Sequence, residues 1–328
     1  MELDLTDKKI LNILQTDFPI SVRPFLDIAN ITGISEEDVL KRIADLKTNR
    51  IIRQISAIFD SHNIGYKSTL AAFKVHNDLV DSAAGIINSH TGVSHNYLRN
   101  NEYNIWFTIT LPSGKSLDDE IKLLSEKSKA SDYLILPTLK LFKIGVNFDM
   151  TGEESSSFKF FSHDDFKDES EIEITDFEKS CIKELQKDLE ITSEPFKSMS
   201  ENLGISQEKL LEHIRNFIKV KKMRRFACVL YHQKAGFSYN IMGIWKSKTE
   251  DAEKNGKIMS SVKEVSHCYL RPVYPGKWEY NIFTMIHSKS KDDAYNVMDR
   301  ISQLTGLNDR DALESTKEFK KVRVQYYV

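Results

Sequence analysis

The stretch SHNYLRNNEYNIWFT, residues 94–108, recurs later in the chain as SHCYLRPVYPGKWEYNIFT, residues 266–284. The first part of each copy alternates like a strand, so every second side chain lies on one face. That face carries an imidazole, a phenol and a guanidinium in both copies: His95, Tyr97 and Arg99, then His267, Tyr269 and Arg271. Further aromatic residues follow after a turn. Hydrogen-bond donors beside flat apolar walls are suited to a planar, polyanionic ligand.

The repeat extends beyond this hairpin. Pro24 and Phe25 correspond to Pro195 and Phe196, and Arg53 corresponds to Arg224 at the same spacing. The chain is therefore predicted to consist of two related halves. Between them lies an acidic, serine-rich stretch with little periodicity, which predicts a linker over residues 151–171.

Each half begins with a helical region. In the first half, Thr6 is expected to cap one helix, Pro24 to start a second, Gly33 to make a turn and Ser35 to cap a third. A strand is expected over residues 52–59, and the second half repeats this pattern over residues 175–230. Three helices followed by a strand predict a winged helix-turn-helix in each half.

The remainder of each half alternates strand and helix patterns in a ferredoxin-like order, βαββαβ. In the first half we expect strands at residues 68–75, 93–100, 103–111 and 139–148, with helices at 79–89 and 117–127. In the second we expect strands at 239–246, 265–273, 278–288 and 321–328, with helices at 251–262 and 292–304. The predicted fold class is α+β, a pseudo-dimer of two such repeats.

These patterns set the predicted domain boundaries. They are residues 1–60 and 172–231 for the winged helices, 61–150 and 232–328 for the ferredoxin-like domains, and 151–171 for the linker.

Composition restricts the functional class. The 328 residues include 46 Lys and Arg and 48 Asp and Glu, which gives a net charge of −2. Such a charge gives no general attraction to nucleic acid or anionic lipid. No apolar run reaches the length of a membrane span, and the first residues lack the apolar core of a signal peptide, so a cytoplasmic protein without membrane partners is expected. Cys181, Cys228 and Cys268 form no metal-binding pair and are expected to be buried, reduced thiols.

The order of elements resembles the Lrp/AsnC regulators. The segments HNYLR and YNIWFT in the first half, with RRFACVLYHQKAGF, SHCYLRP and YNIFTMIH in the second, resemble the two subunits of the siroheme decarboxylase family, here fused in one chain. The resemblance implies an enzyme of heme b or heme d biosynthesis, a carboxy-lyase that removes carbon dioxide from two acetate groups of siroheme. It implies siroheme and its product as partners, no separate organic cofactor, and heme as a further candidate ligand.

The candidate catalytic residues are histidines and a tyrosine. His267 is the candidate proton donor, Tyr269 could orient it, and His95 is its counterpart in the first half. His232 is interpreted as either a proton donor or an axial ligand to the tetrapyrrole iron. A lone strand histidine is more often structural, but the repeated +2 and +4 partners favour function here.

The remaining candidates would hold substrate. Arginines could bind non-reacting carboxylates, and aromatic rings could line the macrocycle. The candidates are Arg53, Tyr97, Arg99, Trp106, Arg224, Arg225, Arg271, Trp278 and Tyr280. The alternatives remain open, because Arg224 and Arg225 could be solvated charges and aromatic residues more often belong to a core. Trp245 is assigned to the core on that ground.

The helix-turn-helix supports a rival function, a transcriptional regulator that could sense heme. The first candidate recognition helix, residues 35–50, carries four basic and four acidic residues. The second, residues 206–222, carries five basic and two acidic residues. A helix that binds DNA phosphates should be basic, so DNA binding ranks second to the enzyme hypothesis, and an intramolecular pseudo-dimer, with a homodimer as a further option, is expected.

Overall fold

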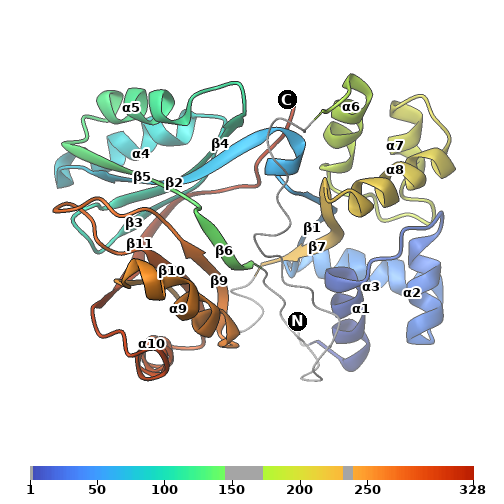
Figure 1. Ribbon diagram of the computed structural model, residues 1–328. Helices are drawn as coiled ribbons and strands as arrows, with labels where there is room; N and C mark the ends of the chain where they lie inside the picture. Colours follow the sequence, from blue (N-terminus) through green and yellow to red (C-terminus); the bar gives the residue numbers. More distant parts are fainter. Residues whose placement is uncertain (1–2, 145–172, 232–238) are drawn as a thin grey trace.

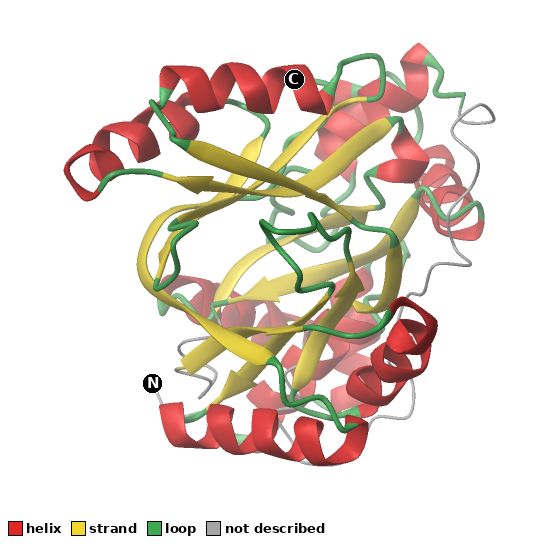
Figure 2. Ribbon diagram, turned by 60° about the vertical axis from the view of Figure 1, so that its left-hand side comes forward, coloured by secondary structure: helices red, strands yellow, loops and turns green. Residues whose placement is uncertain are grey.

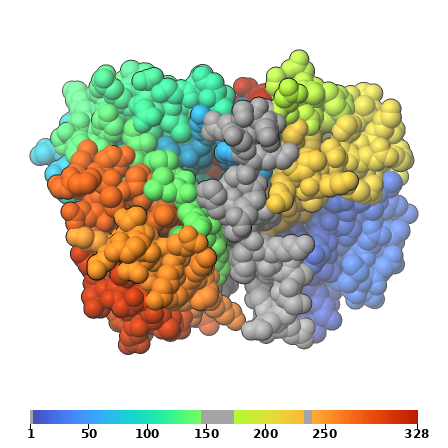
Figure 3. Space-filling view, in the orientation of Figure 1, coloured from blue at the N-terminus to red at the C-terminus, as the bar shows by residue number. Residues whose placement is uncertain are grey.

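The computed structural model describes residues 3–144, 173–231 and 239–328. His232 and the predicted linker, residues 151–171, lie outside the described residues. The molecule has a helical part, drawn in blue and yellow in Figure 3, beside a sheet part to which both halves contribute. No helix within the described ranges combines the length and apolar character needed to cross a membrane.

The helical part contains three helices from each half: α1 (Leu5–Thr16), α2 (Pro24–Thr32), α3 (Glu36–Thr48), α6 (Asp176–Leu185), α7 (Lys197–Asn202) and α8 (Gln207–Lys219). Pro24 begins α2, and Gly33 ends it with φ of 75°, where a side chain would be strained. Ser35 caps α3 by accepting from the Asp38 amide. The prediction for α1 was wrong, because Asp4 rather than Thr6 is the N-cap and forms a capping box with Asp7.

The two strands that follow these helices pair with each other. β1 (Ile52–Phe59) and β7 (Met223–Leu230) form an antiparallel two-stranded sheet across the halves. One apolar core unites both sets of helices with this sheet. Neither strand forms a wing hairpin within its own half, so the expected wings are a shared structure that joins the halves (Figure 1).

The sheet part confirms two ferredoxin-like units. The first contains β2 (Tyr66–Lys74), β3 (Val93–Arg99), β4 (Ile105–Pro112) and β5 (Asp132–Pro137), with η1 (His62–Ile64), η2 (Asn77–Leu79), α4 (Val80–Ser89) and α5 (Leu117–Lys127). The second contains β8 (Tyr239–Trp245), β9 (Val265–Leu270), β10 (Ile282–Ser288) and β11 (Arg310–Lys321), with α9 (Thr249–Ser261) and α10 (Lys291–Thr305). Their strand orders, β5-β2-β4-β3 and β11-β8-β10-β9, are equivalent.

The halves exchange strands at both junctions. The first part of β11 pairs with β8, and its second part continues onto β3 of the other half. In return β6 (Lys140–Ile144), which follows β5 after two residues, pairs with β9. The strand order is β5-β2-β4-β3-β11-β8-β10-β9-β6. Its first and last strands, β5 and β6, thus belong to one bent segment of the chain. The predicted intramolecular pseudo-dimer is therefore built by shared β-pairing.

Three apolar cores hold this sheet part together. One lies between the first unit's strands and its helices α4 and α5, and another lies under α9 and α10. Figure 2 shows the curved strands between these helical layers. The third core lies between the units and takes Trp106, Trp278, Phe283 and Leu313 from both halves. Trp245 is fully buried, as predicted.

Three strand predictions need correction. Residues 322–328 form no strand, because the last strand is β11 and ends at Lys321. Within the strand expected at 139–148, only β6 is described. β5 was not predicted. All three errors concern the bent segments: β5 pairs with β2 of its own half, whereas β6 and the second part of β11 pair with strands of the other half.

Candidate functional site

The repeated histidine, tyrosine and arginine share one face of β3 and of β9. The His95 and Tyr97 rings lie stacked with centroids 6.3 Å apart, and the His267 and Tyr269 rings repeat this at 6.1 Å. Arg271 lies 4.8 Å above the Tyr269 ring, as Arg99 lies above Tyr97 at 5.5 Å. Asn96, between them in sequence, turns the other way and donates to the Ala84 carbonyl and the Asn88 amide oxygen on α4.

Each histidine is fixed by the preceding serine. Nδ1 of His95 lies 2.9 Å from Ser94 Oγ, and Nδ1 of His267 lies 2.8 Å from Ser266 Oγ. Ser266 Oγ also lies 3.2 Å from the Met285 carbonyl oxygen, which can accept its proton. In both histidines the contact orients the imidazole and engages Nδ1.

His267 stands in a cationic surrounding. Burial, followed by the neighbouring His287, Arg224, His95 and Lys143, lowers the pKa of His267 to about 3. Lys143 reaches this group from β6 of the first half, where its ammonium donates to the Val262 carbonyl. The imidazole of His267 is therefore neutral near pH 7 in the ligand-free protein.

Arg99 and Arg271 connect the halves. Both are buried, and Arg99 Nη1 donates to the Leu313 carbonyl at 2.6 Å, while Arg271 Nη1 donates to the Leu136 carbonyl. Burial lowers the pKa of both arginines to about 10. Within the described ranges neither guanidinium has an ion pair, and neither Nε has a hydrogen-bond partner. Two buried cations without carboxylate partners are costly unless an anion joins them.

The core between the units contains Trp106, Trp278 and Tyr280, three of the aromatic residues predicted to line the substrate. The Trp106 and Trp278 rings pack 5.5 Å apart in the core between the units, and Tyr280 packs 5.3 Å from Trp278. Trp106 donates its indole N–H to the Tyr103 carbonyl. Packing accounts for the burial of these rings, and their contact with substrate stays a prediction.

The arginines of the two-stranded sheet reach the same region. Arg224 on β7 makes two hydrogen bonds to Asp60, from Nε at 3.0 Å and Nη2 at 2.8 Å, and acts electrostatically on His267 and Tyr269. Arg53 on β1 donates to the Lys321 carbonyl at 3.1 Å and acts on Tyr97. Arg225 is adjacent to Arg224, and burial lowers the pKa of its guanidinium. The structure thus brings Arg53 and Arg224 to the repeated face.

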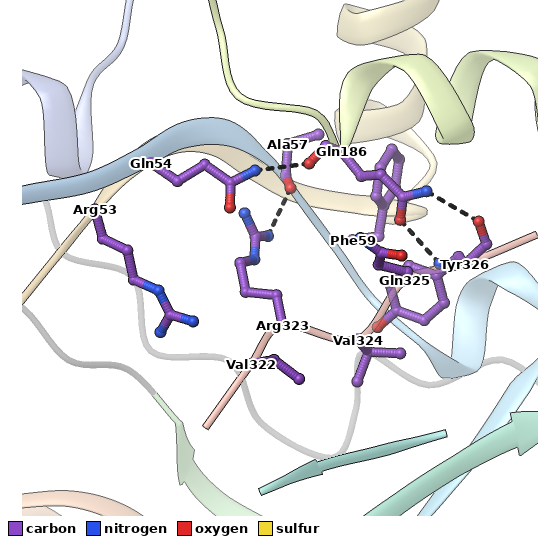
Figure 4. Close-up of a pocket in the computed structure, with 10 residues that line it drawn as sticks. All are labelled: Arg53, Gln54, Ala57, Phe59, Gln186, Val322, Arg323, Val324, Gln325 and Tyr326. Carbon is purple, nitrogen blue, oxygen red and sulfur yellow. Dashed lines mark hydrogen bonds between the residues drawn. The ribbon is translucent and has the colours of Figure 1, made fainter. Parts of the chain in front are cut away.

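A cavity of about 160 Å³ lies beside this face, between β1 and the C-terminal segment. Arg53 and Arg323 both line it (Figure 4). The sequence did not predict Arg323 as a site residue, because it lies within a predicted strand. The available signal was that the aligned position in the other half is not an arginine. Ligand sites usually measure about 300–1,000 Å³, so the cavity could admit part of a tetrapyrrole but not all of it.

The described ranges include all three cysteines. There, no group of three or more His, Cys, Asp or Glu side chains could hold a metal ion. All three cysteines are buried and outside any disulfide, as predicted. Burial raises the pKa of the Cys181 thiol to about 11 and also raises that of Cys268, so both thiols are protonated.

Known proteins match the whole arrangement. A family model described as the siroheme decarboxylase NirDL-like HTH domain matches residues 7–53 and 178–224. An AsnC-like ligand binding domain matches residues 63–143 and 234–320. The siroheme decarboxylase of Hydrogenobacter thermophilus is 37% identical over 97% of this chain and 94% of its own. This chain belongs to the siroheme decarboxylase family.

Solved structures of the family have the same fold. The crystal structure of the siroheme decarboxylase NirDL matches with a TM-score of 0.77 at 32% identity, over 98% of this chain and 94% of that one. A second crystal structure, of NirDL with an iron-uroporphyrin III analogue, matches with a TM-score of 0.76 at 31% identity, over 98% and 95% of the two chains. Membership of this family favours the enzyme hypothesis over the regulator alternative.

Proposed function

We propose that the protein removes carbon dioxide from two acetate side chains of siroheme, as the names of its relatives describe for them. The observation that carries the proposal is the repeated histidine, tyrosine and arginine face, next to buried guanidinium groups that have no ion pair within the described residues. A ligand rich in carboxylates complements such a face. The iron-uroporphyrin III analogue bound by a family member is a ligand of this kind.

The reaction requires only a proton from the protein. The bond between the acetate methylene and its carboxylate breaks, carbon dioxide leaves, and the electron pair remains on the methylene and spreads into the macrocycle. A proton then joins that carbon to give a methyl group. The step is redox-neutral, so it needs no separate organic cofactor, and the tetrapyrrole iron belongs to the substrate.

His267 is our candidate donor of that proton. In the ligand-free protein it is neutral, because its surroundings are dry and cationic. A bound polyanion would reverse the electrostatic part of this effect and raise the pKa of His267, which would charge the imidazole only when substrate is present. Ser266 would hold the ring while Nε2 delivers the proton.

The other groups have supporting roles in this proposal. Tyr269, stacked on His267 and close to Arg271, would orient the imidazole or a carboxylate. The arginines would hold non-reacting carboxylates, since a cation on the reacting carboxylate would oppose the loss of its charge. His95 would serve an equivalent place in the first half. His232 remains our candidate for an axial ligand or a second donor.

The test is conversion of siroheme under anaerobic conditions. Purified protein should bind siroheme and release a product lighter by two carbon dioxide units, as measured by mass spectrometry. Protein heated to unfold it serves as the control. Binding with an unchanged siroheme mass would contradict the proposed activity.

A further inference from the structure

The C-terminal segment makes the two halves chemically unequal. β11 pairs Glu318 with Tyr97 and Lys321 with His95. The equivalent strand β6 pairs Leu141 with Tyr269 and Ile144 with His267. Two charged side chains beside the first repeated face, on β3, therefore correspond to two aliphatic ones beside the second, on β9.

The alignment of the two segments can be continued along the sequence. Two residues after Lys321 stands Arg323, and two residues after Ile144 the sequence has Val146. Arg323 lies against β1, where it donates to Ser56 Oγ and, at 2.8 Å, to the Ala57 carbonyl. Its guanidinium thus enters the cavity beside Arg53 with two contacts that fix its direction (Figure 4).

The two arginines are not neutralised by acids. Within the described part of the chain, neither Arg53 nor Arg323 forms an ion pair, although each is only partly exposed. Burial and the nearby Arg53 lower the pKa of Arg323. The nearby acids are engaged elsewhere: Asp60 holds Arg224, and Glu318 lies 3.9 Å from the Lys321 ammonium. Two guanidinium groups that line one partly buried cavity are unfavourable without an anion.

We infer that Arg53 and Arg323 form a carboxylate-binding subsite that anchors the acidic side chains of the tetrapyrrole on the first-half side. This inference rests on the proposed function and adds a positioning residue, Arg323, at whose aligned position in the first half the sequence has Val146. On the side of the second repeated face, Arg224, which corresponds to Arg53 in sequence, already makes two hydrogen bonds to Asp60.

Titration of the full-length protein with iron uroporphyrin III tests the subsite without turnover. We expect Arg323→Gln and Arg53→Gln each to raise the dissociation constant about tenfold or more, since each removes a charge-assisted contact. Both variants should also show a shallower dependence of affinity on salt, because one screened charge pair is lost. Arg300→Gln is the matched control, since Arg300 is paired with Glu264 on the surface of α10.

Folding is checked by thermal unfolding of every variant. Arg323→Gln removes contacts to β1, so Arg53→Gln, which loses only a bond to the Lys321 carbonyl, keeps the test valid if the first variant unfolds. If the unaltered protein binds and both glutamine variants bind with the same affinity and salt dependence, the subsite is refuted while the proposed function stands. If the unaltered protein does not bind the iron uroporphyrin, both are refuted.

Discussion

At the scale of single residues, His267 illustrates how the surroundings change a group that sequence alone presents as an ordinary histidine. Its strand position, its serine and its tyrosine neighbour follow from local sequence. Its depressed pKa does not, because the largest cause is burial in the folded chain, and the charges that add to it include Arg224 from β7 and Lys143 from the other half. A proton donor of this kind depends on its ligand to become charged.

Replacing His267 should affect turnover more than binding. We expect His267→Ala to lower kcat about a hundredfold to ten-thousandfold while siroheme still perturbs the absorption spectrum, because a general acid acts only in the transition state. Single-turnover kinetics measures this. His95→Ala is the internal control: a loss confined to His95 would place the chemistry in the first half, and unchanged rates in both would make the repeated histidine structural.

The depressed pKa of His267 predicts that the stability of the protein depends on pH. In the unfolded chain its pKa is about 6.5, and in the folded protein about 3. The unfolded state therefore binds the proton first, so the free energy of unfolding should fall as pH drops from about 6.5 towards 3. Urea unfolding across this range should show a weaker pH dependence in His267→Asn. His76→Asn, on an exposed turn, is the control and should leave the dependence unchanged.

At the scale of elements, β11 shows why a strand can be missed. Its sequence, RDALESTKEFKK, is polar along most of its length, and the more β-like VRVQYYV follows it. β11 forms because β8 and β3 supply partners along it in succession. The following residues instead carry Tyr326 and Tyr327 to the helical core. Pairing partners therefore decided the conformation against local propensity.

Two glycines at the centres of helices should respond in opposite ways to alanine. A Cβ at Gly256 on α9 would overlap the Phe142 ring, which β6 brings from the first half, whereas a Cβ at Gly85 on α4 meets no atom within 4 Å. Gly256→Ala should lower the free energy of unfolding by about 1–2 kcal/mol, because overpacking outweighs the gain in helix propensity. Gly85→Ala should raise it by about 0.5–1 kcal/mol. Chemical denaturation measures both, and equal effects would mean that β6 does not pack tightly on α9.

At the scale of the whole molecule, the halves are joined by more than the chain. β1 with β7, β3 with β11 and β6 with β9 all pair residues from different halves. Arg99 and Arg271 add buried hydrogen bonds across the same junctions. We therefore expect the two halves to unfold as one cooperative unit.

Cutting the chain between the halves should not separate them. A specific protease site inserted within residues 151–171 should, once cleaved, give two fragments that still elute together in size-exclusion chromatography and retain iron uroporphyrin binding. The shared strands and common helical core supply the reason. Fragments that separate under native conditions would contradict this account.

DNA binding is not expected, despite the helix-turn-helix. Several cations of the candidate recognition helices make internal contacts: Arg42 binds Asp4 and Asp7, Lys47 binds Asp188, and Arg215 donates to the Ile20 carbonyl. They are therefore less available to phosphates. Gel-shift assays at physiological salt should show no sequence-specific complex, and nanomolar, salt-resistant retention of one fragment would reverse this prediction.

The sequence by itself determined the repeat, both helix-turn-helix regions, the ferredoxin-like order and the repeated face of histidine, tyrosine and arginine. Each of these depends on local patterns of residues. Tertiary structure alone determined which half supplies each strand, and it placed Trp106 and Trp278 in the core between the halves. It also brought Arg323 beside Arg53, although about 270 residues of chain separate them. The sequence of a strand carries no periodic pattern that tells which half supplies its partner. Only the folded chain therefore reveals these pairings.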